Sequence, residues 1–237
     1  MQDKKESSII LHISTFPPRE CGIASFTQDL TEAFAKKFNP VVKTEICALN
    51  EHATSIYNYG RGVCCQIDAD EIENYVSLAK QINSRPEVKI VNIQHEFGIF
   101  GGRQGDYLIP FLQALEKPAI TTFHSVLPNP DKFLKKTVSS IASKSKALVV
   151  MNKLSRQILE SDYQVANSKI FFIGHGIPQV AYETGKKYKK EIGCEGKTVL
   201  STFGFISKNK GIEFAIRALP RIIQARPDLV YLVIGET

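Results

Sequence analysis

Three histidines of this 237-residue chain come at or just after the ends of short apolar runs that have the composition of buried strands: His95, His124 and His175. In an open parallel sheet, ligands bind beyond the carboxyl ends of the strands. A neutral imidazole can donate and accept hydrogen bonds there and can take up a proton near neutral pH. Each histidine alone would more often be structural, and only their convergence on one sheet edge favours a binding or catalytic site.

Two loops that precede predicted helices have the composition of anion-binding loops. The first, residues 14–25, contains two prolines and then Gly22 before the helical pattern starts. The N–H groups of a helix start attract an anion, and a glycine lets a ligand approach the backbone closely. A plain strand-to-helix turn remains the alternative here, because a single glycine is weak evidence.

The second loop, residues 204–211, has a stronger pattern. It combines Gly204 and Gly211 with Lys208 and Lys210 directly ahead of a predicted helix. The helix dipole disfavours lysines at this position, so their presence favours a phosphate or diphosphate ligand with Lys210 as its point charge. A solvated helix start with glycines for the turn is the alternative.

The catalytic motifs most often found on such sheets are absent from the sequence. It contains no HExxH helix, GxSxG turn, GxGxxG dinucleotide loop or Walker phosphate loop. The five cysteines form no CxxC pair, and no histidine lies at zinc-ligand spacing from them. We therefore expect neither a metal site nor a disulfide framework, and the cysteine usage favours a reducing compartment.

Short apolar runs alternate with amphipathic stretches along most of the chain. Residues 1–177 predict one α/β domain with a Rossmann-like parallel sheet covered on both faces. Residues 178–195 are polar and lysine-rich, which predicts a linker. Residues 196–237 predict a strand, a helix and a second strand, which is one βαβ unit and so the incomplete start of a second domain. The predicted strands are residues 9–13, 41–49, 63–67, 90–93, 119–123, 147–150, 170–173, 198–203 and 229–234.

The net charge is +6, from 30 Lys and Arg against 24 Asp and Glu. This balance suits a phosphate-bearing ligand, an anionic membrane surface or nucleic acid, and equally a plain lysine-rich surface. The densest run, residues 186–190, holds a single aromatic residue, which favours a solvated linker over a nucleic-acid arm. No apolar run approaches the ~20 residues that span a bilayer. We expect a cytoplasmic protein, with peripheral contact at the inner face of the membrane as an open alternative.

The order of these segments resembles that of the retaining glycosyltransferases of family 4. The resemblance rests on residues 15–24 (TFPPRECGIA), 122–125 (TFHS), 175–177 (HGI), 203–211 (FGFISKNKG) and 232–236 (LVIGE). It implies the GT-B fold of two facing Rossmann-like domains, the first binding mostly the acceptor and the second the nucleotide sugar. It implies transfer of a hexose, mannose being one candidate, from a nucleotide-diphosphate sugar to a carbohydrate or lipid-linked acceptor with retention of configuration.

Site residues follow from the resemblance position by position. His124 matches the histidine that lies near the transferred sugar and is the candidate catalytic residue. Gly22, Gly204 and Lys210 match residues around the donor diphosphate. The candidates on the acceptor side are Glu20, Ser25, His95 and Glu96. The resemblance implies no metal and no cofactor, because the nucleotide-diphosphate sugar is a substrate, and no nucleic-acid partner.

Two departures from the family pattern weaken this expectation. Phe205 stands where the family commonly has an arginine, and the paired-glutamate motif of the second domain would lie beyond Thr237. We therefore expect this chain by itself to be inactive. A non-catalytic carbohydrate or polyanion-binding module, or a GT-B phosphorylase or epimerase, remains an alternative. Because one βαβ unit cannot bury the apolar stripe of residues 212–223, we also expect it to dock on the first domain or to self-associate.

Overall fold

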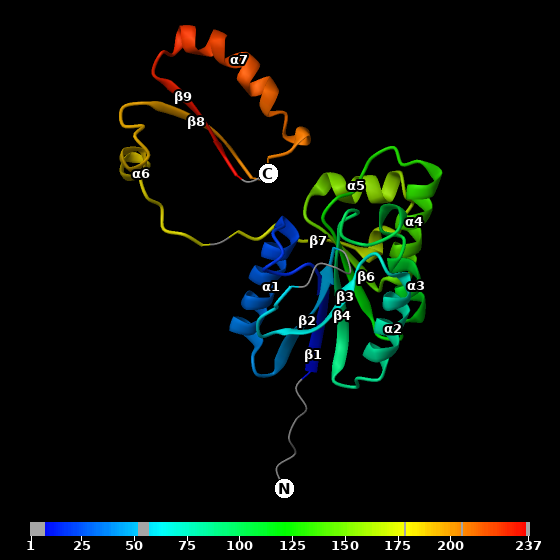
Figure 1. Cartoon of the computed structure of the whole chain (residues 1–237). Helices are drawn as coiled ribbons and strands as arrows, with labels where there is room; N and C mark the ends of the chain where they lie inside the picture. Colours follow the sequence, from blue (N-terminus) through cyan, green and yellow to red (C-terminus); the bar gives the residue numbers. More distant parts are fainter. Residues whose placement is uncertain (1–7, 52–56, 178, 205, 236–237) are drawn as a thin grey trace. The chain divides into compact units, whose positions relative to one another are not determined.

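The computed structural model describes residues 8–51, 57–177, 179–204 and 206–235 (Figure 1). The chain divides into two compact units, Met1–Pro178 and Gln179–Thr237. Phe205, which departs from the family pattern, lies outside the described residues.

The first unit contains a seven-stranded sheet in which every neighbouring pair of strands is parallel. The strand order is β3-β2-β1-β4-β5-β6-β7, so the order reverses between β1 and β4. This confirms the predicted α/β fold with a parallel sheet. The strands are β1 (Ser8–Ser14), β2 (Val42–Asn50), β3 (Val63–Asp68), β4 (Val88–His95), β5 (Ala119–Phe123), β6 (Ala147–Val150) and β7 (Ile170–Phe172).

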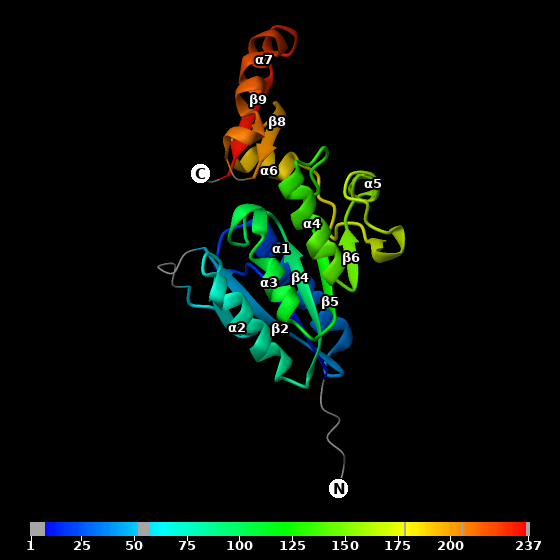
Figure 2. The same cartoon turned by 90° about the vertical axis from the view of Figure 1, so that its right-hand side faces the viewer.

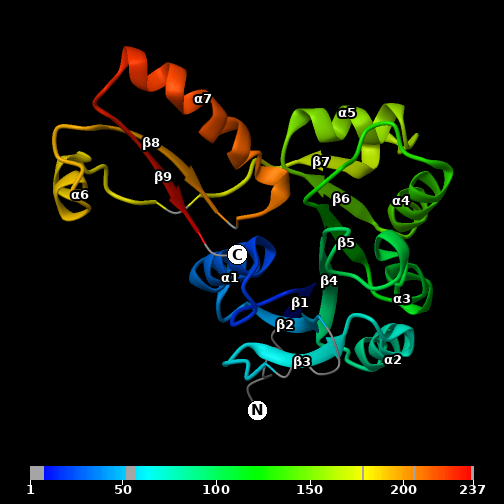
Figure 3. The ribbon, with the colours of Figure 1, turned by 45° about the horizontal axis from the view of Figure 1, so that its top comes forward.

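Helices cover the two faces of this sheet unequally. Helix α1 (Gly22–Phe38) packs on β1 and β2 from one side, whereas α2 (Ile72–Asn83), α3 (Leu108–Ala114) and α4 (Lys132–Lys144) lie together on the other (Figure 3). Figure 2 looks onto these three helices in front of the strands. Helix α5 (Lys153–Ser161) packs against β6 and β7.

Side-chain caps fix where several of these helices begin. The Asp131 carboxylate accepts a hydrogen bond from the Leu134 amide at 2.7 Å and starts α4. The Asn152 side chain accepts one from the Ser155 amide and starts α5. Such caps satisfy amides that have no partner within the helix. The core lies between the sheet and α2–α4, where Leu11, Ile93, Phe123 and Leu148 of adjacent strands and Phe111 of α3 are buried.

The segment predicted as a linker contains a helix that the sequence pattern did not indicate, α6 (Lys186–Glu191). None of its residues is buried, so the lysines are solvated as expected. Lysine and glutamate are good helix formers, and the Lys189 ammonium donates to the Lys197 carbonyl at 2.8 Å, which ties the helix to the next strand.

After α6, the second unit contains a strand, a helix and a strand in the predicted βαβ order. Strands β8 (Thr198–Phe203) and β9 (Leu229–Ile234) pair in parallel, and α7 (Ile212–Ala225) connects them. None of the α7 residues is buried, and Phe214, Ile216 and Ile223 are exposed. None of the helices in the described ranges of either unit has both the length and the apolar character that crossing a membrane requires.

The exposed face of α7 leads to a prediction about association. We expect the chain either to self-associate with rising concentration or to protect the α7 amides from hydrogen exchange by docking, because exposed apolar patches of this kind favour burial. Ile216→Asp should weaken whichever interaction occurs, and Glu213→Gln on the same helix is the matched control. Light scattering that shows only monomers, combined with α7 amides that exchange as fast as a free peptide, would contradict this expectation.

Candidate functional site at the carboxyl edge of the sheet

His124 lies directly after β5 and is held by the neighbouring strand. Its amide donates to the His95 carbonyl at 2.9 Å, which extends the β4–β5 pairing by one residue. Its Nε2 lies 2.9 Å from Oε1 of Gln94, a fully buried residue of β4. The amide nitrogen of Gln94 in turn donates to Oδ1 of Asn92 at 3.1 Å. A connected set of polar groups therefore orients the imidazole.

The surroundings of His124 favour its neutral form. Burial lowers the pKa of His124 to about 4, and the nearby His175 contributes in the same direction. The Phe26 ring meets the His124 ring edge-on at 4.8 Å between centroids and meets the His175 ring at 5.1 Å. A single aromatic residue of α1 thus lies against both histidines. At neutral pH, His124 is a hydrogen-bonding group without charge.

Glu96 and Ser125 form a second polar pair at the same edge. The Ser125 hydroxyl donates to Glu96 Oε2 at 2.6 Å, and the Phe97 amide donates to Glu96 Oε1 at 3.0 Å. This pair connects the residue after β4 to the second residue after β5. Both residues are half-buried, so their remaining lone pairs can accept hydrogen bonds from a hydroxyl ligand.

The loop after β1 leads into the start of α1. Cys21 is the N-cap, with its Sγ accepting from the Ala24 amide at 3.3 Å and lying 3.0 Å from the Thr15 hydroxyl. Gly22 is exposed, and a Cβ built on it would meet no atom within 4 Å. The Arg19 guanidinium donates to the Leu49 carbonyl at 3.0 Å and so ties the loop to β2. The space beside Gly22 is therefore open at the start of α1.

The two acceptor-side candidates of this loop are both accessible. Glu20 is exposed and lines a hollow of about 470 Å³ together with Arg19, Glu51 and Tyr57. Ser25 is exposed on the first turn of α1. Carboxylate, guanidinium and phenol groups in one hollow can hydrogen-bond a polyhydroxyl ligand.

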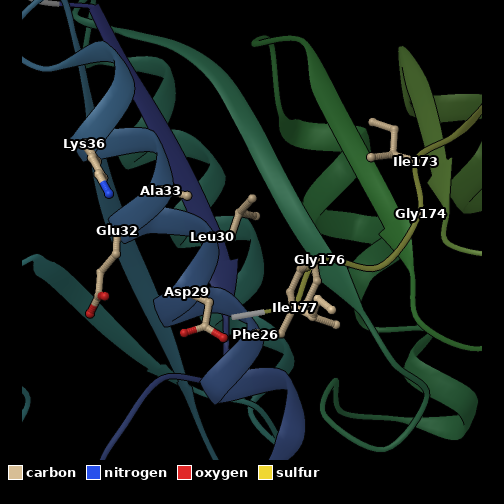
Figure 4. A pocket seen from close by; sticks show the side chains of 10 residues that line it. All are labelled: Phe26, Asp29, Leu30, Glu32, Ala33, Lys36, Ile173, Gly174, Gly176 and Ile177. Atoms are coloured by element: carbon tan, nitrogen blue, oxygen red, sulfur yellow. The ribbon is translucent and has the colours of Figure 1, made fainter. Parts of the chain in front are cut away.

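A groove of about 500 Å³ runs beside this edge, between α1 and the segment after β7 (Figure 4). The apolar side chains of its lining are Phe26, Leu30 and Ala33 of α1 and Ile173 and Ile177 of the segment after β7. The three charged residues of its lining belong to α1: Asp29, Glu32 and Lys36. Phe26 therefore belongs both to this groove and to the surroundings of His124.

His95 does not join the other candidates. It is fully buried among the rings of Phe97, Phe100 and Phe123, with the Phe100 ring stacked at 5.6 Å. Neither of its ring nitrogens has a hydrogen-bond partner among the described residues, and burial lowers its pKa to about 3. Successive residues of a strand face opposite sides, so Gln94 faces His124 and His95 points into the core. Its burial favours a structural role, and an acceptor-side role stays an untested prediction.

In the second unit, Gly204 and Lys210 come together at the carboxyl end of β8. The Lys210 ammonium lies 4.0 Å from the point where a Cβ on Gly204 would stand. The Gly204 amide donates to the Ile234 carbonyl at 3.0 Å. A Cβ on Gly235 would lie 1.9 Å from the Gly204 carbonyl oxygen, so only glycine fits where the two strand ends meet. An exposed lysine therefore lies beside the glycine at the end of β8, and its ammonium is a point charge that suits a phosphate group.

Sequence reasoning missed two residues of the edge, Gln94 and Phe26. Gln94 was detectable as a polar residue in an apolar strand, in phase with Asn92 two residues earlier. Phe26 has the helical spacing of a core residue, and nothing in the sequence distinguishes it from one. Within the part of the chain that the structure describes, no group of three or more His, Cys, Asp or Glu residues has the arrangement of a metal site.

Solved structures of other proteins share the fold of this chain. No protein-family model matches the chain, and no curated protein sequence matches it. A glycosyltransferase from Rickettsia africae matches 97% of the chain with a TM-score of 0.66 and 18% sequence identity. The Anabaena protein HepE, solved in complex with UDP and glucose, matches 97% of the chain with a TM-score of 0.65 and 12% identity. The chain spans 60% and 62% of the length of these two proteins. Identities this low show the fold alone, and by that measure the chain shares the Rossmann-like α/β fold of these two proteins.

Proposed function

We propose that this chain is the acceptor-side domain and the start of the donor-side domain of an enzyme that transfers a hexose from a nucleotide-diphosphate sugar. The acceptor is a carbohydrate or a lipid-linked carbohydrate, and the anomeric configuration is retained, as in family 4. The observation that carries the proposal is the cluster of Gln94, Glu96, His124 and Ser125 at one sheet edge. The amide, carboxylate, imidazole and hydroxyl groups of these four residues can form hydrogen bonds with the hydroxyl groups of a sugar.

The chemistry of the proposed reaction fits the groups on both units. The leaving group is a nucleoside diphosphate, so negative charge grows on phosphate oxygens in the transition state. Helix-start amides such as those at Gly22 and a lysine such as Lys210 stabilise that charge where it develops. His124, neutral and held by Gln94, positions the sugar by a hydrogen bond. The reaction needs no cofactor, because the nucleotide sugar is itself the donor substrate.

Two likenesses support the proposal from different directions. The order of motifs along the sequence resembles family 4, and the structure resembles a glycosyltransferase and a protein solved with UDP and glucose. We extend the nucleotide-sugar donor to this chain as part of the proposal. Peripheral membrane contact would accompany a lipid-linked acceptor, and the net charge of +6 is compatible with it.

The test uses the protein encoded by the full reading frame and the three common classes of donor, which are UDP-, GDP- and ADP-hexoses. We expect one class to be consumed with release of the nucleoside diphosphate, in the presence of a carbohydrate acceptor. Sugar transfer that depends on inorganic phosphate would favour a phosphorylase. Acceptor binding without turnover of any donor would favour the non-catalytic binding module.

Lys210→Ala gives a prediction for the donor side. We expect nucleoside diphosphate affinity to fall about 10- to 100-fold, because hydrogen bonds to charged groups contribute about 1.5–3 kcal/mol. Lys190→Ala removes an exposed lysine of α6 and is the matched control. Calorimetric titration of both variants measures the difference. Equal affinities of Lys210→Ala and the parent would remove Lys210 from the donor site.

A further inference from the structure

The direction of the hydrogen bond between Gln94 and His124 follows from which end of the Gln94 amide faces the imidazole. The amide nitrogen of Gln94 is used as a donor to Asn92 Oδ1, at 3.1 Å. Its Oε1, which only accepts hydrogen bonds, therefore faces His124 Nε2 at 2.9 Å. The imidazole nitrogen at this contact must carry a hydrogen. The other ring nitrogen, Nδ1, then keeps its lone pair.

The sheet explains why these three side chains meet. Asn92 and Gln94 lie two residues apart on β4 and so project from the same face. Gln94 pairs in register with Thr122 of β5, and His124 follows Thr122 by two residues and shares its face. The backbone bond from the His124 amide to the His95 carbonyl holds this register past the end of β5. Gln94 is fully buried, so no competing solvent contact turns its amide.

We propose that Gln94, oriented by Asn92, is a positioning residue that fixes His124 as the neutral Nε2–H tautomer, with Nδ1 as a hydrogen-bond acceptor. This inference deepens the proposed function: His124 then accepts a hydrogen bond from a hydroxyl of the bound sugar and does not donate one. A ligand group that offers only lone pairs gains nothing from it. Burial also keeps the imidazole uncharged, so its Nδ1 keeps the lone pair that accepts this hydrogen bond.

Groups with charge or titratable protons surround His124 on each side. His175 lies across the Phe26 ring, His95 is its backbone neighbour on β4, and the Glu96 carboxylate bonds the adjacent Ser125. His175 opposes the protonation of His124, and His124 opposes that of His95. In the described part of the chain, Gln94 is the side-chain hydrogen-bond partner of His124 Nε2.

The experiment is long-range ¹H–¹⁵N correlation NMR of the chain at neutral pH, with His124 assigned from the signal that a His124→Gln variant loses. We expect a pyrrole-like nitrogen at Nε2 and a pyridine-like one at Nδ1. Gln94→Leu should lower the ratio of the Nε2–H tautomer to the Nδ1–H tautomer about fivefold, the factor expected for one lost hydrogen bond. Asn92→Asp keeps an acceptor for the Gln94 amide nitrogen and should leave the His124 signals in place.

A second variant keeps the test independent of how well Gln94→Leu folds. Gln94→Glu places a carboxylate at the same contact, which should raise the midpoint of the His124 titration toward neutral pH. An Nδ1–H tautomer in the parent would overturn the proposal, and so would His124 signals unchanged in both Gln94 variants. None of these readouts needs a donor or turnover, so failure of the proposed function would leave this result standing on its own.

Discussion

Replacing His124 by alanine should lower the rate of sugar transfer about 100-fold in the protein encoded by the full reading frame. Misplacing a reacting group by about an ångström can cost this much, and His124 is held at the edge by a backbone and a side-chain hydrogen bond to β4. We expect the loss mainly in kcat, because the interaction matters most where the sugar must be aligned for transfer. Initial rates at saturating donor measure it.

Leu127→Ala is the control for this substitution. Leu127 lies in the same loop with an exposed side chain, and its carbonyl, which accepts from the Tyr163 hydroxyl at 2.7 Å, is kept. Thermal unfolding of both variants verifies that the loop and the core survive. An unchanged transfer rate in a folded His124→Ala protein would remove His124 from the site.

Acid should destabilise the first unit strongly between pH 6.5 and pH 4. His12 and His95 are fully buried, and burial lowers their pKa values to about 4 and about 3. Well above pH 6.5, the ordinary pKa of histidine, both side chains are neutral in the folded and in the unfolded chain. As the pH falls below 6.5 the unfolded chain binds protons that the folded chain excludes, so the free energy of unfolding falls.

The size of this effect is comparable with the whole stability of a domain. One pH unit between the folded and unfolded pKa values corresponds to about 1.4 kcal/mol. By pH 4 each of the two histidines therefore lowers the free energy of unfolding by on the order of 3 kcal/mol, and typical domains have about 5–15 kcal/mol in total. Urea unfolding at several pH values measures the slope, with the interval from pH 7 to 8 as an internal reference.

His12→Leu should make the acid transition shallower. Both ring nitrogens of His12 lack a hydrogen-bond partner among the described residues, and its ring packs edge-on against Phe34 at 6.1 Å. Leucine keeps the apolar contact and removes the protonation site, so the variant should gain stability over the parent at pH 5 more than at pH 7. A parent protein whose unfolding free energy is the same at pH 7 and pH 5 would contradict the assignment of buried neutral histidines.

Much of the fold could be predicted from the sequence because its strands are short, continuous and apolar. Residues 90–93 and 147–150 have few polar interruptions, which is the pattern of a strand buried on both faces of a parallel sheet. The helix spacing of residues 212–223 likewise predicted α7. Helix α6 was missed because a run of lysines without apolar residues gives no amphipathic period, although lysine itself favours helix.

The candidate site was predicted less completely, for reasons of geometry. The sequence gives no reason to distinguish His95 from His124, since both come at the ends of predicted buried strands. The structure separates them, because His95 falls on the core side of β4 and His124 on the side of α1. A shift of one residue along a strand moves a side chain to the other face of the sheet. The sequence pattern does not give the register of the strands, so it could not predict which face each histidine occupies. Gln94 lies next to His124 because β4 pairs with β5, and the sequence alone does not show which strands are neighbours.

The measurement that bears most directly on the proposed function is NMR of the product formed from an α-linked nucleotide-diphosphate hexose by the protein encoded by the full reading frame. The proposal predicts an α-glycoside of the acceptor and one nucleoside diphosphate released per glycoside, without added phosphate. A β-glycoside would contradict retention. Failure to form any glycoside from UDP-, GDP- and ADP-hexoses across carbohydrate and lipid-linked acceptors would contradict sugar transfer itself.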